Sequence, residues 1–377
     1  MRQKLQTTFN STVRGAALVV ALVALMLPAS VSAEGSAGAV MNDLGINMSG
    51  FIDTAYSHNF NNPGDSANGG RIFDVNDDSF TLHQAQLLFE REAVMGKSLA
   101  DRSGFALRLG YGEDARLFAP GDTDTGDEFD IEEAYVTFAL TDTLQAKMGK
   151  YATLLGAEVI ESKDNLNFSR SFLFGFAIPF THTGVRLNYA PSDVLDINIG
   201  LVNGWDTLGN DDNGTPSIEA SMTLNGGNIS WSNAIIYGDE PSGVTQTERF
   251  VYDTIVALDA TDQLSFMVNF DYGSEQGTSL VTAGDNSNWY GAAAYAHYAA
   301  TDRIGFTVRS EVFRDADGAR TGMQQTLYET TLTTAYKMTS ALQTRLEFRH
   351  DESNVPGFFA AGKDHQNTIA AELIFSF

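Results

Sequence analysis

The chain has 377 residues, with 23 Lys and Arg against 48 Asp and Glu, and it contains no Cys. The formal charge of −25 argues against a nucleic-acid ligand, because a polyanion of this size repels DNA and RNA alike. A hydrophobic content of 43% argues against a disordered chain. The absence of Cys excludes disulfide scaffolds, thiolate metal sites and cysteine nucleophiles.

The first 33 residues are predicted to be a cleaved signal peptide. Three cations (Arg2, Lys4 and Arg14) accompany the apolar run 16–27, and the small residues before the expected cleavage point end at Ala33. This apolar run is too short to cross a hydrocarbon core of about 30 Å as a helix. We therefore expect export with cleavage after about Ala33, which takes the formal charge from −25 to −28.

Beyond the signal peptide, the dominant pattern is an alternation of apolar and polar residues with a period of two. It is clearest in the sequence LSFMVNFDY at 264–272. Such alternation is typical of a β-strand with one apolar and one polar face. In chain order, the predicted strands include 105–111, 134–140, 185–189, 195–201, 218–224, 252–258, 264–272, 304–312, 342–349 and 369–377.

Short turns and long polar links alternate between these strands. The turns are predicted at 141–143, 191–193, 225–228, 260–262, 300–302 and 337–340. The long links are predicted at 59–79, 112–128, 151–181, 204–216, 238–248, 273–288 and 351–366. One connection, 92–102, departs from the rhythm because it falls where a short turn is expected and is longer than the other turns.

This asymmetry is typical of an up-and-down antiparallel transmembrane β-barrel, with short periplasmic turns and long extracellular loops. We count about sixteen strands from Ile46 to Phe377, which gives an all-β fold. Because this number is even, both chain termini of the barrel are expected on the side of the short turns. A barrel of this size encloses a lumen wide enough for water. A soluble β-sandwich is the alternative, although it requires no rhythm of short and long connections.

Aromatic residues at the strand ends favour a membrane barrel, because Tyr and Trp rings suit the bilayer interface. They are Tyr56, Phe89, Tyr111, Tyr189, Tyr237, Tyr272, Tyr298, Tyr336 and Phe348. The last strand ends on Phe377, an arrangement with which outer-membrane proteins characteristically finish. The expected partners are therefore outer-membrane lipids, lipopolysaccharide and the barrel-insertion machinery that reads this last strand.

From Gly50 to its end the chain resembles the β-barrel porin-2 family of OmpL-like outer-membrane porins. The most specific stretch is 149–189, with Gly149-Lys150, NLNFSRSFLFG at 165–175 and PFTHTG at 179–184. GFID at 50–53 and LHQAQ at 82–86 also match the family pattern. The resemblance implies an outer-membrane barrel with a pore and names no solute. We therefore divide the chain into a signal peptide (1–33), a short periplasmic segment (34–44) and a barrel (45–377).

Under the barrel interpretation, the polar phase of each strand faces the lumen. An Arg or Lys on the lipid side at the bilayer midplane costs about 2–4 kcal/mol. The predicted pore-lining residues are Arg108, Glu133, Lys147, Arg186, Arg309, Glu311, Arg345, Glu347 and Arg349. These charges either tune which ions enter or pair across strands and stiffen the wall, and both interpretations are kept.

The longest connection, 151–181, carries apolar residues that a solvated loop does not need, among them Phe172 and Phe174. Our hypothesis is that it folds into the barrel mouth and narrows the channel. Four charged residues are then expected near the constriction: Glu158, Glu161, Lys163 and Arg170. A structural latch on the wall is the alternative.

Acidic residues concentrate in the long links, where oxygen-rich loops can bind Ca²⁺. They include Asp122, Asp124, Asp127, Glu128, Asp206, Asp211, Asp212, Asp315 and Asp317. None matches the spacing of a calcium loop, so no metal site and no cofactor are predicted. Solvated anionic loops, bridged by divalent ions to lipopolysaccharide, are the simpler interpretation.

The sequence offers little for an enzyme. Its six His are scattered, and it has neither an HExxH pair nor a Gly-x-Ser-x-Gly nucleophile turn. We predict a porin that passes small hydrophilic solutes or ions by passive diffusion, without catalytic residues. A closed, adhesin-like barrel with acidic surface loops and a barrel-embedded hydrolase are the alternatives. A homotrimer is expected from the size, although no intersubunit face stands out.

Overall fold

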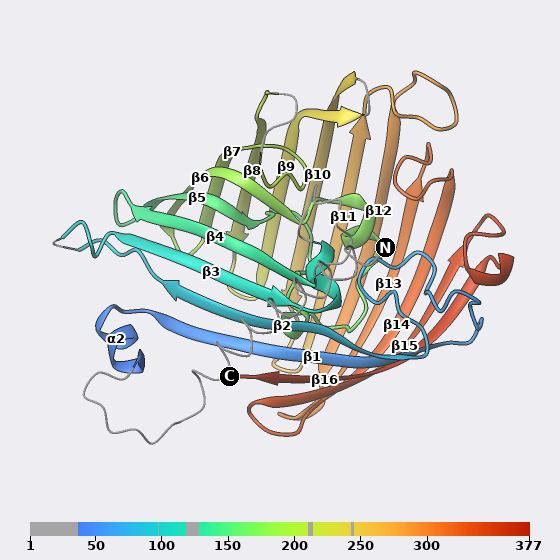
Figure 1. Cartoon of the computed structure of the whole chain (residues 1–377), viewed down its shortest axis with the longest axis horizontal. Coiled ribbons are helices and arrows are strands. Elements are labelled where there is room, and N and C mark those ends of the chain that lie inside the picture. Colours follow the sequence, from blue (N-terminus) through green and yellow to red (C-terminus); the bar gives the residue numbers. More distant parts are fainter. Residues whose placement is uncertain (1–36, 97, 118–127, 210–213, 243–244) are drawn as a thin grey trace, which may run out of the picture.

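The computed structural model describes residues 37–96, 98–117, 128–209, 214–242 and 245–377. These residues form a closed barrel of sixteen antiparallel strands, preceded by the short helix α2 (Ala37–Asp43) (Figure 1). The strands are β1 (Asn47–Asn59), β2 (Ser79–Arg91), β3 (Ser103–Tyr111), β4 (Phe129–Ala139), β5 (Leu144–Ala152), β6 (Thr181–Ser192), β7 (Leu195–Val202), β8 (Ser217–Asn225), β9 (Ile229–Ser242), β10 (Thr245–Asp259), β11 (Leu264–Glu275), β12 (Ser287–Ala299), β13 (Ile304–Asp315), β14 (Gln325–Lys337), β15 (Leu342–Ser353) and β16 (His365–Ser376).

Every strand pairs with its sequence neighbours, and β1 pairs with β16 to close the sheet. At the seam, Gly50 and Phe377 exchange two backbone hydrogen bonds of 3.0 Å. The Phe377 ring lies where a side chain on Gly50 would stand. The sixteen antiparallel strands confirm the predicted architecture. The start of β1 and the finish of β16 both lie at the barrel end that carries the short turns. This end is called the turn end below, and the opposite one the loop end.

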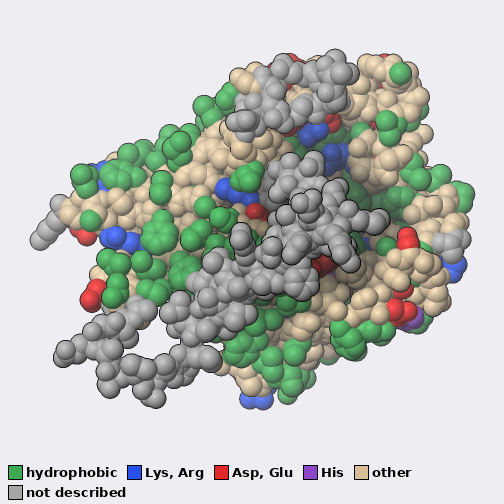
Figure 2. All heavy atoms as spheres, in the orientation of Figure 1, with side chains coloured by type: hydrophobic (Ala, Val, Ile, Leu, Met, Phe, Trp, Pro, Cys, Tyr) green, Lys and Arg blue, Asp and Glu red, His purple; other side chains and the backbone are tan. Residues whose placement is uncertain are grey.

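The two faces of each strand separate polar from apolar side chains as the alternation predicts. On β11, Phe266, Val268 and Phe270 are exposed on the outside, whereas Asn269 and Asp271 are buried on the inside. Hydrophobic side chains lie over the outer surface of the strands (Figure 2). Among the described residues, no helix is both long enough and apolar enough to cross a membrane.

One predicted link is wrong. The polar segment 238–248 is not a long loop, because β9 continues to Ser242 and β10 begins at Thr245, with ladder pairs throughout. Its Gly, Pro and acidic residues resemble a loop in sequence. In the structure they extend the hairpin, and Glu240 accepts hydrogen bonds from the Trp205 N–H and the Ser217 hydroxyl.

The largest hydrophobic cluster lies inside the barrel, between the connection from β5 to β6 and the strands β12 to β15, which are called the far wall below. The connection contributes Phe172, Leu173 and Ile178, and the wall contributes Trp289 and Phe313. Further loops cover this cluster from the loop end: Phe73 lies in the connection from β1 to β2, and Phe359 in the connection from β15 to β16. Part of the lumen is therefore filled by a packed apolar core.

Candidate functional site: the lumen and its inner loop

The connection from β5 to β6, residues 153–180, crosses the lumen and is called the inner loop below. Two carboxylates of the far wall accept hydrogen bonds from its backbone. Glu347 accepts the N–H groups of Phe168 and Ser169 at 2.7 and 3.0 Å. Glu311 accepts those of Phe172 and Leu173 at 2.7 and 2.5 Å. The inner loop is thus attached to β13 and β15 through main-chain groups.

Three arginines of the same wall bind the inner loop from beside these carboxylates. Arg345 donates to the carbonyl oxygens of Ser162, Asn165 and Asn167, at distances of 2.7–3.0 Å. Arg349 donates to the carbonyl of Arg170, and to the Ser169 hydroxyl at 3.2 Å.

Arg309 is the third of these arginines and lies at the centre of the far wall. It contacts Glu158 of the inner loop at 2.5 Å and Glu329 of β14 at 2.8 Å, and it donates to the Ser169 carbonyl at 2.7 Å. Its side chain is fully buried. All five far-wall residues predicted from the alternation therefore contact the inner loop.

The strands β3 to β6, called the near wall below, carry the other four predicted residues. Arg108 pairs with Glu133 at 3.0 Å and with Glu161 of the inner loop at 2.9 Å. Arg186 pairs with Glu219 at 2.8 Å. The Lys147 ammonium lies 4.2 Å from the centre of the Tyr135 ring, a cation–π distance. The inner loop consequently has ionic contacts with both walls.

The predicted inner-loop charges have different environments. Arg170 donates to the carbonyls of Val159, Ile160 and Phe168, so it stabilises the fold of the loop itself. Lys163 is partly exposed and pairs with Asp164 at 2.6 Å. The predicted residues are thus brought together along one loop, but Arg170 is turned into it.

Glu158 is buried in the inner loop, which disfavours its ionised form. Arg309 and the Ser171 N–H more than compensate for this burial and hold the pKa of Glu158 below its usual value. Asp206, in the connection from β7 to β8, shows the opposite balance. Burial raises the pKa of Asp206, although its carboxylate accepts the N–H groups of Phe180 and Thr181. Asp206 therefore differs from the solvated acidic residues that the sequence predicts for the long loops.

The other acidic loop residues singled out from the sequence divide into three groups. Glu128 is exposed and accepts the Tyr111 hydroxyl at 2.5 Å. Asp315 accepts the N–H groups of Arg320 and Thr321, and Asp317 accepts that of Asn288. Asp315 and Asp317 therefore organise loops. Asp122, Asp124, Asp127, Asp211 and Asp212 lie outside the described residues.

The counter-ions are the main residues that the sequence did not single out. Glu329 and Glu219 neutralise Arg309 and Arg186, and Asp351 pairs with Arg349 at 2.7 Å. Arg71, from the connection between β1 and β2, also reaches Asp351, at 2.6 Å. The inward phase of alternation indicates the wall acids, but no local pattern indicates Arg71.

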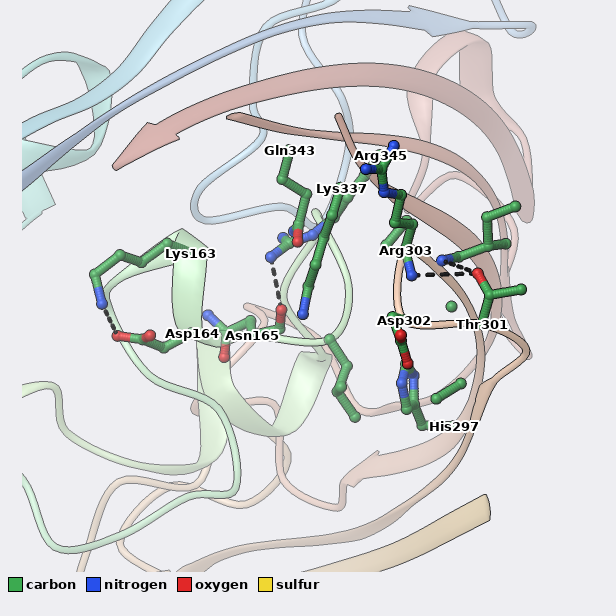
Figure 3. A pocket seen from close by; sticks show the side chains of 15 residues that line it. Lys163, Asp164, Asn165, His297, Thr301, Asp302, Arg303, Lys337, Gln343 and Arg345 are labelled. Atoms are coloured by element: carbon green, nitrogen blue, oxygen red, sulfur yellow. Dashed lines mark hydrogen bonds and ion pairs between the residues drawn. The ribbon is translucent and has the colours of Figure 1, made fainter. Parts of the chain in front are cut away.

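A recess of about 290 Å³ opens at the turn end between the inner loop and the strands from β12 to β15 (Figure 3). Its charged lining consists of Lys163, Arg303, Lys337 and Arg345 against Asp164 and Asp302. Cations therefore outnumber acids there, although the whole chain is strongly acidic.

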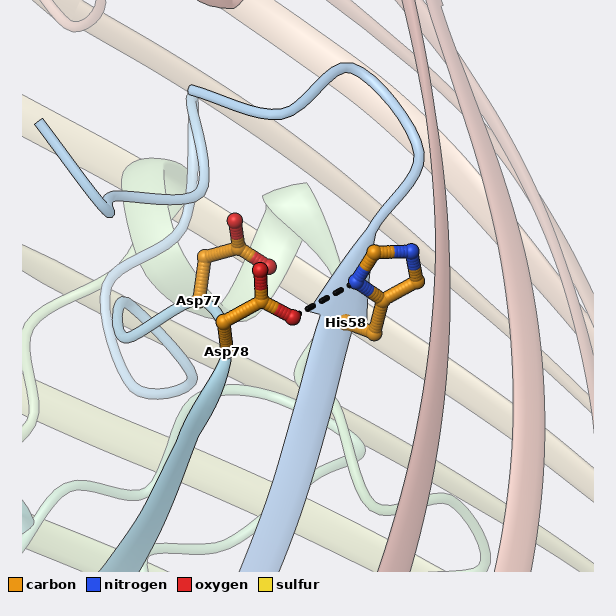
Figure 4. Close-up of side chains that lie close together, drawn as sticks. All are labelled: His58, Asp77 and Asp78. Carbon is orange, nitrogen blue, oxygen red and sulfur yellow. Dashed lines mark hydrogen bonds and ion pairs between the residues drawn. The ribbon is translucent and has the colours of Figure 1, made fainter. Parts of the chain in front are cut away.

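Among the described residues, one His and Asp group has the spacing of metal ligands, His58 with Asp77 and Asp78 (Figure 4). It lies where the connection from β1 to β2 meets β2. His58 Nδ1 is 2.7 Å from Asp78 Oδ1, and Asp77 Oδ1 accepts the Asn59 N–H. His58 belongs to the outward phase of β1, so this group lies apart from the lumen. Its contacts fasten the connection to β1.

The family model described as "Putative beta-barrel porin-2, OmpL-like" matches residues 45–377. No curated protein matches the sequence. Among solved structures, the outer-membrane channel DcaP of Acinetobacter baumannii is 13% identical with a TM-score of 0.60, over 88% of this chain and 97% of that one. OmpT of Vibrio cholerae, in its trimer form, is 11% identical with a TM-score of 0.59, over 88% and 99%. OprB of Pseudomonas putida is 12% identical with a TM-score of 0.53, over 90% and 96%. At these identities the solved structures show a shared fold.

Proposed function

Because the chain belongs to the β-barrel porin-2, OmpL-like family, we propose that small hydrophilic solutes and ions diffuse passively through its lumen, past the inner loop. The observation that carries this proposal is the attachment of the inner loop to Glu311 and Glu347 across the lumen. A loop held there by carboxylates and arginines narrows the aqueous path, and its fixed charges act on ions at short range. No chemical step and no energy source are required.

The charged residues then have two roles. Arg108, Glu133 and Lys147 of the near wall are only partly buried and face the remaining aqueous path. Arg309, Arg345 and the other far-wall charges hold the inner loop in place. The proposed diffusion requires neither catalytic residues nor a cofactor.

Deletion of residues 165–172 tests the proposal. We expect a higher single-channel conductance in planar bilayers, because the deletion removes the attachment to Glu347. Deletion of residues 278–284, in the connection from β11 to β12, is the control and should leave the conductance near the wild-type value. Equal conductance and ion preference in the wild type and the 165–172 deletion would contradict the role of the inner loop.

A closed barrel with a structural or adhesive role is the second candidate, and the apolar core inside the lumen favours it. Liposomes separate the two. Swelling in sugar solutions supports the porin, whereas osmotic stability with correctly folded protein supports the closed barrel.

We further propose export to the outer membrane with cleavage after about Ala33, insertion directed by the strand ending at Phe377, and contact with lipopolysaccharide. Assembly as a homotrimer is also proposed. It is supported by the likeness to OmpT of Vibrio cholerae, which was solved in a trimer form. Cross-linking of membranes before solubilisation tests the trimer.

A further inference from the structure

Two aspartates meet inside the barrel, and no described residue supplies a counter-ion to them. Asp253 of β10 and Asp271 of β11 are direct cross-strand partners, and both side chains are fully buried on the lumen side. Their carboxyl groups contact each other. Like charges placed directly opposite one another destabilise a sheet, so this pair needs a compensating positive charge.

Few hydrogen-bond donors reach the pair. The Asn269 amide donates to Asp253 Oδ2 at 2.6 Å and to the Thr254 carbonyl at 3.4 Å, so both of its N–H groups are engaged. Within the described part of the chain, Asp253 Oδ1 and both oxygens of Asp271 accept no hydrogen bond of normal geometry, although the Gly156 N–H lies near Asp253 and the Asn269 amide near Asp271. Three of the four carboxylate oxygens are thus buried and unsatisfied.

Several other acids of the same lumen are compensated in one of two ways. Glu219 and Glu329 pair with arginines, at 2.8 Å each. Glu311 instead accepts two backbone N–H groups of the inner loop. Asp271 has neither kind of partner among the described residues, and its strongest electrostatic neighbours are the acids Asp253 and Glu311. An uncompensated buried charge costs several kcal/mol per ion.

The inner loop lies directly against the pair. The Gly156 N–H approaches the Asp253 carboxyl group, and the Ala157 N–H donates to Asn269 Oδ1 at 3.3 Å. A charge bound between the two aspartates would therefore stand where the start of the inner loop meets β10 and β11.

We propose that Asp253 and Asp271 bind one hard divalent cation, with Ca²⁺ as the ion of best fit. The unsatisfied atoms are all carboxylate oxygens, the ligands that Ca²⁺ prefers, and their combined charge of about −2 matches a divalent ion. The ion compensates the negative charge of the buried pair and stabilises the contact of the inner loop with β10 and β11. This site is independent of the solute that crosses the channel.

The test uses the full mature barrel, refolded in detergent and treated with EGTA that is then removed. Titration with CaCl₂ in a calorimeter should show one saturable site per barrel. CaCl₂ should also raise the Tm in a concentration-dependent way, and EGTA should reverse this shift, because an ion that binds only the folded state stabilises it.

Asp271→Asn and Asp253→Asn should abolish both the calorimetric signal and the Tm shift. The amide introduced at position 271 can donate to Asp253, so this variant is expected to fold. Asp259→Asn, at the exposed end of β10, is the matched control and should bind Ca²⁺ like the wild type.

Two results would overturn the proposal. One is a wild-type barrel that neither binds Ca²⁺ nor gains thermal stability from it, in which case a proton shared by the two carboxyl groups compensates the pair. The other is unchanged Ca²⁺ binding in Asp271→Asn. Wild-type conductance is recorded in parallel, so that loss of the cation site is distinguished from loss of the channel.

Discussion

At the scale of single residues, the lumen is stabilised by charges that depend on one another. Arg309 is fully buried and neutralises Glu158 of the inner loop and Glu329 of β14 at once. Removing one member of a buried ionic group leaves the others as uncompensated charges in a medium that solvates them poorly. Such residues are therefore far more sensitive to substitution than the charges at the turns.

Arg309→Ala is expected to lower the free energy of unfolding by about 3–5 kcal/mol, because Glu158 and Glu329 lose their shared cation. Urea unfolding followed by intrinsic fluorescence in detergent measures the change. Arg303→Ala, at the exposed turn between β12 and β13, should shift the same free energy by less than about 0.5 kcal/mol. Similar losses in the two variants would show that the ionic group is not the cause.

At the scale of elements, the barrel depends on close approach at its seam. Gly50 and Phe377 exchange backbone hydrogen bonds, and an added Cβ at Gly50 would lie 2.7 Å from the Phe377 ring and 2.5 Å from the Gln86 carbonyl oxygen. Phe377 cannot retreat without loosening the contact between β1 and β16, and Gln86 cannot retreat without loosening the pairing of β1 with β2.

Gly50→Ala is therefore expected to reduce the fraction of chains that fold into the heat-modifiable barrel, as measured by the band shift on unheated gels. Gly64→Ala is the control, because an added Cβ there meets no atom within 4 Å. A normal folded fraction in Gly50→Ala would contradict the importance of this close approach.

The strands were largely predictable because their order depends on a local pattern. The alternation in LSFMVNFDY gave β11 and its inward face directly, with Asp271 on the polar side. The hairpin at 238–248 was not predictable, since the partners of Glu240 lie on other segments, at Trp205 and Ser217.

In the candidate site, too, the local pattern predicts some features and not others. Alternation predicts that Arg309 faces inward, but its contact with Glu158 joins residues 151 positions apart. The cost of burying Asp253 beside Asp271 likewise becomes visible only once the register of β10 with β11 is known. Contacts between distant segments were therefore beyond the reach of a local pattern.

At the scale of the whole molecule, charge is distributed unevenly. The chain carries a formal charge of −25, yet the recess at the turn end is lined by four cations and two acids. An aqueous path that leaves through this recess passes a positive region, which attracts anions and repels cations at short range.

Lys337→Glu should accordingly shift the reversal potential in a KCl gradient toward cation preference, because it reverses one charge of the recess. Lys337→Gln should give about half of that shift, since it only removes the charge. Identical reversal potentials in the three proteins would mean that permeating ions do not pass this recess.

The attachment of the inner loop also determines which substitutions preserve its hydrogen bonds. Glu311 and Glu347 hold main-chain N–H groups, which every residue except proline supplies. New side chains at positions 168, 169, 172 and 173 therefore leave these four hydrogen bonds available. A proline at any of the four positions is the substitution that removes one of these bonds, whereas the burial of Phe172 and Leu173 in the apolar core limits which side chains can replace them.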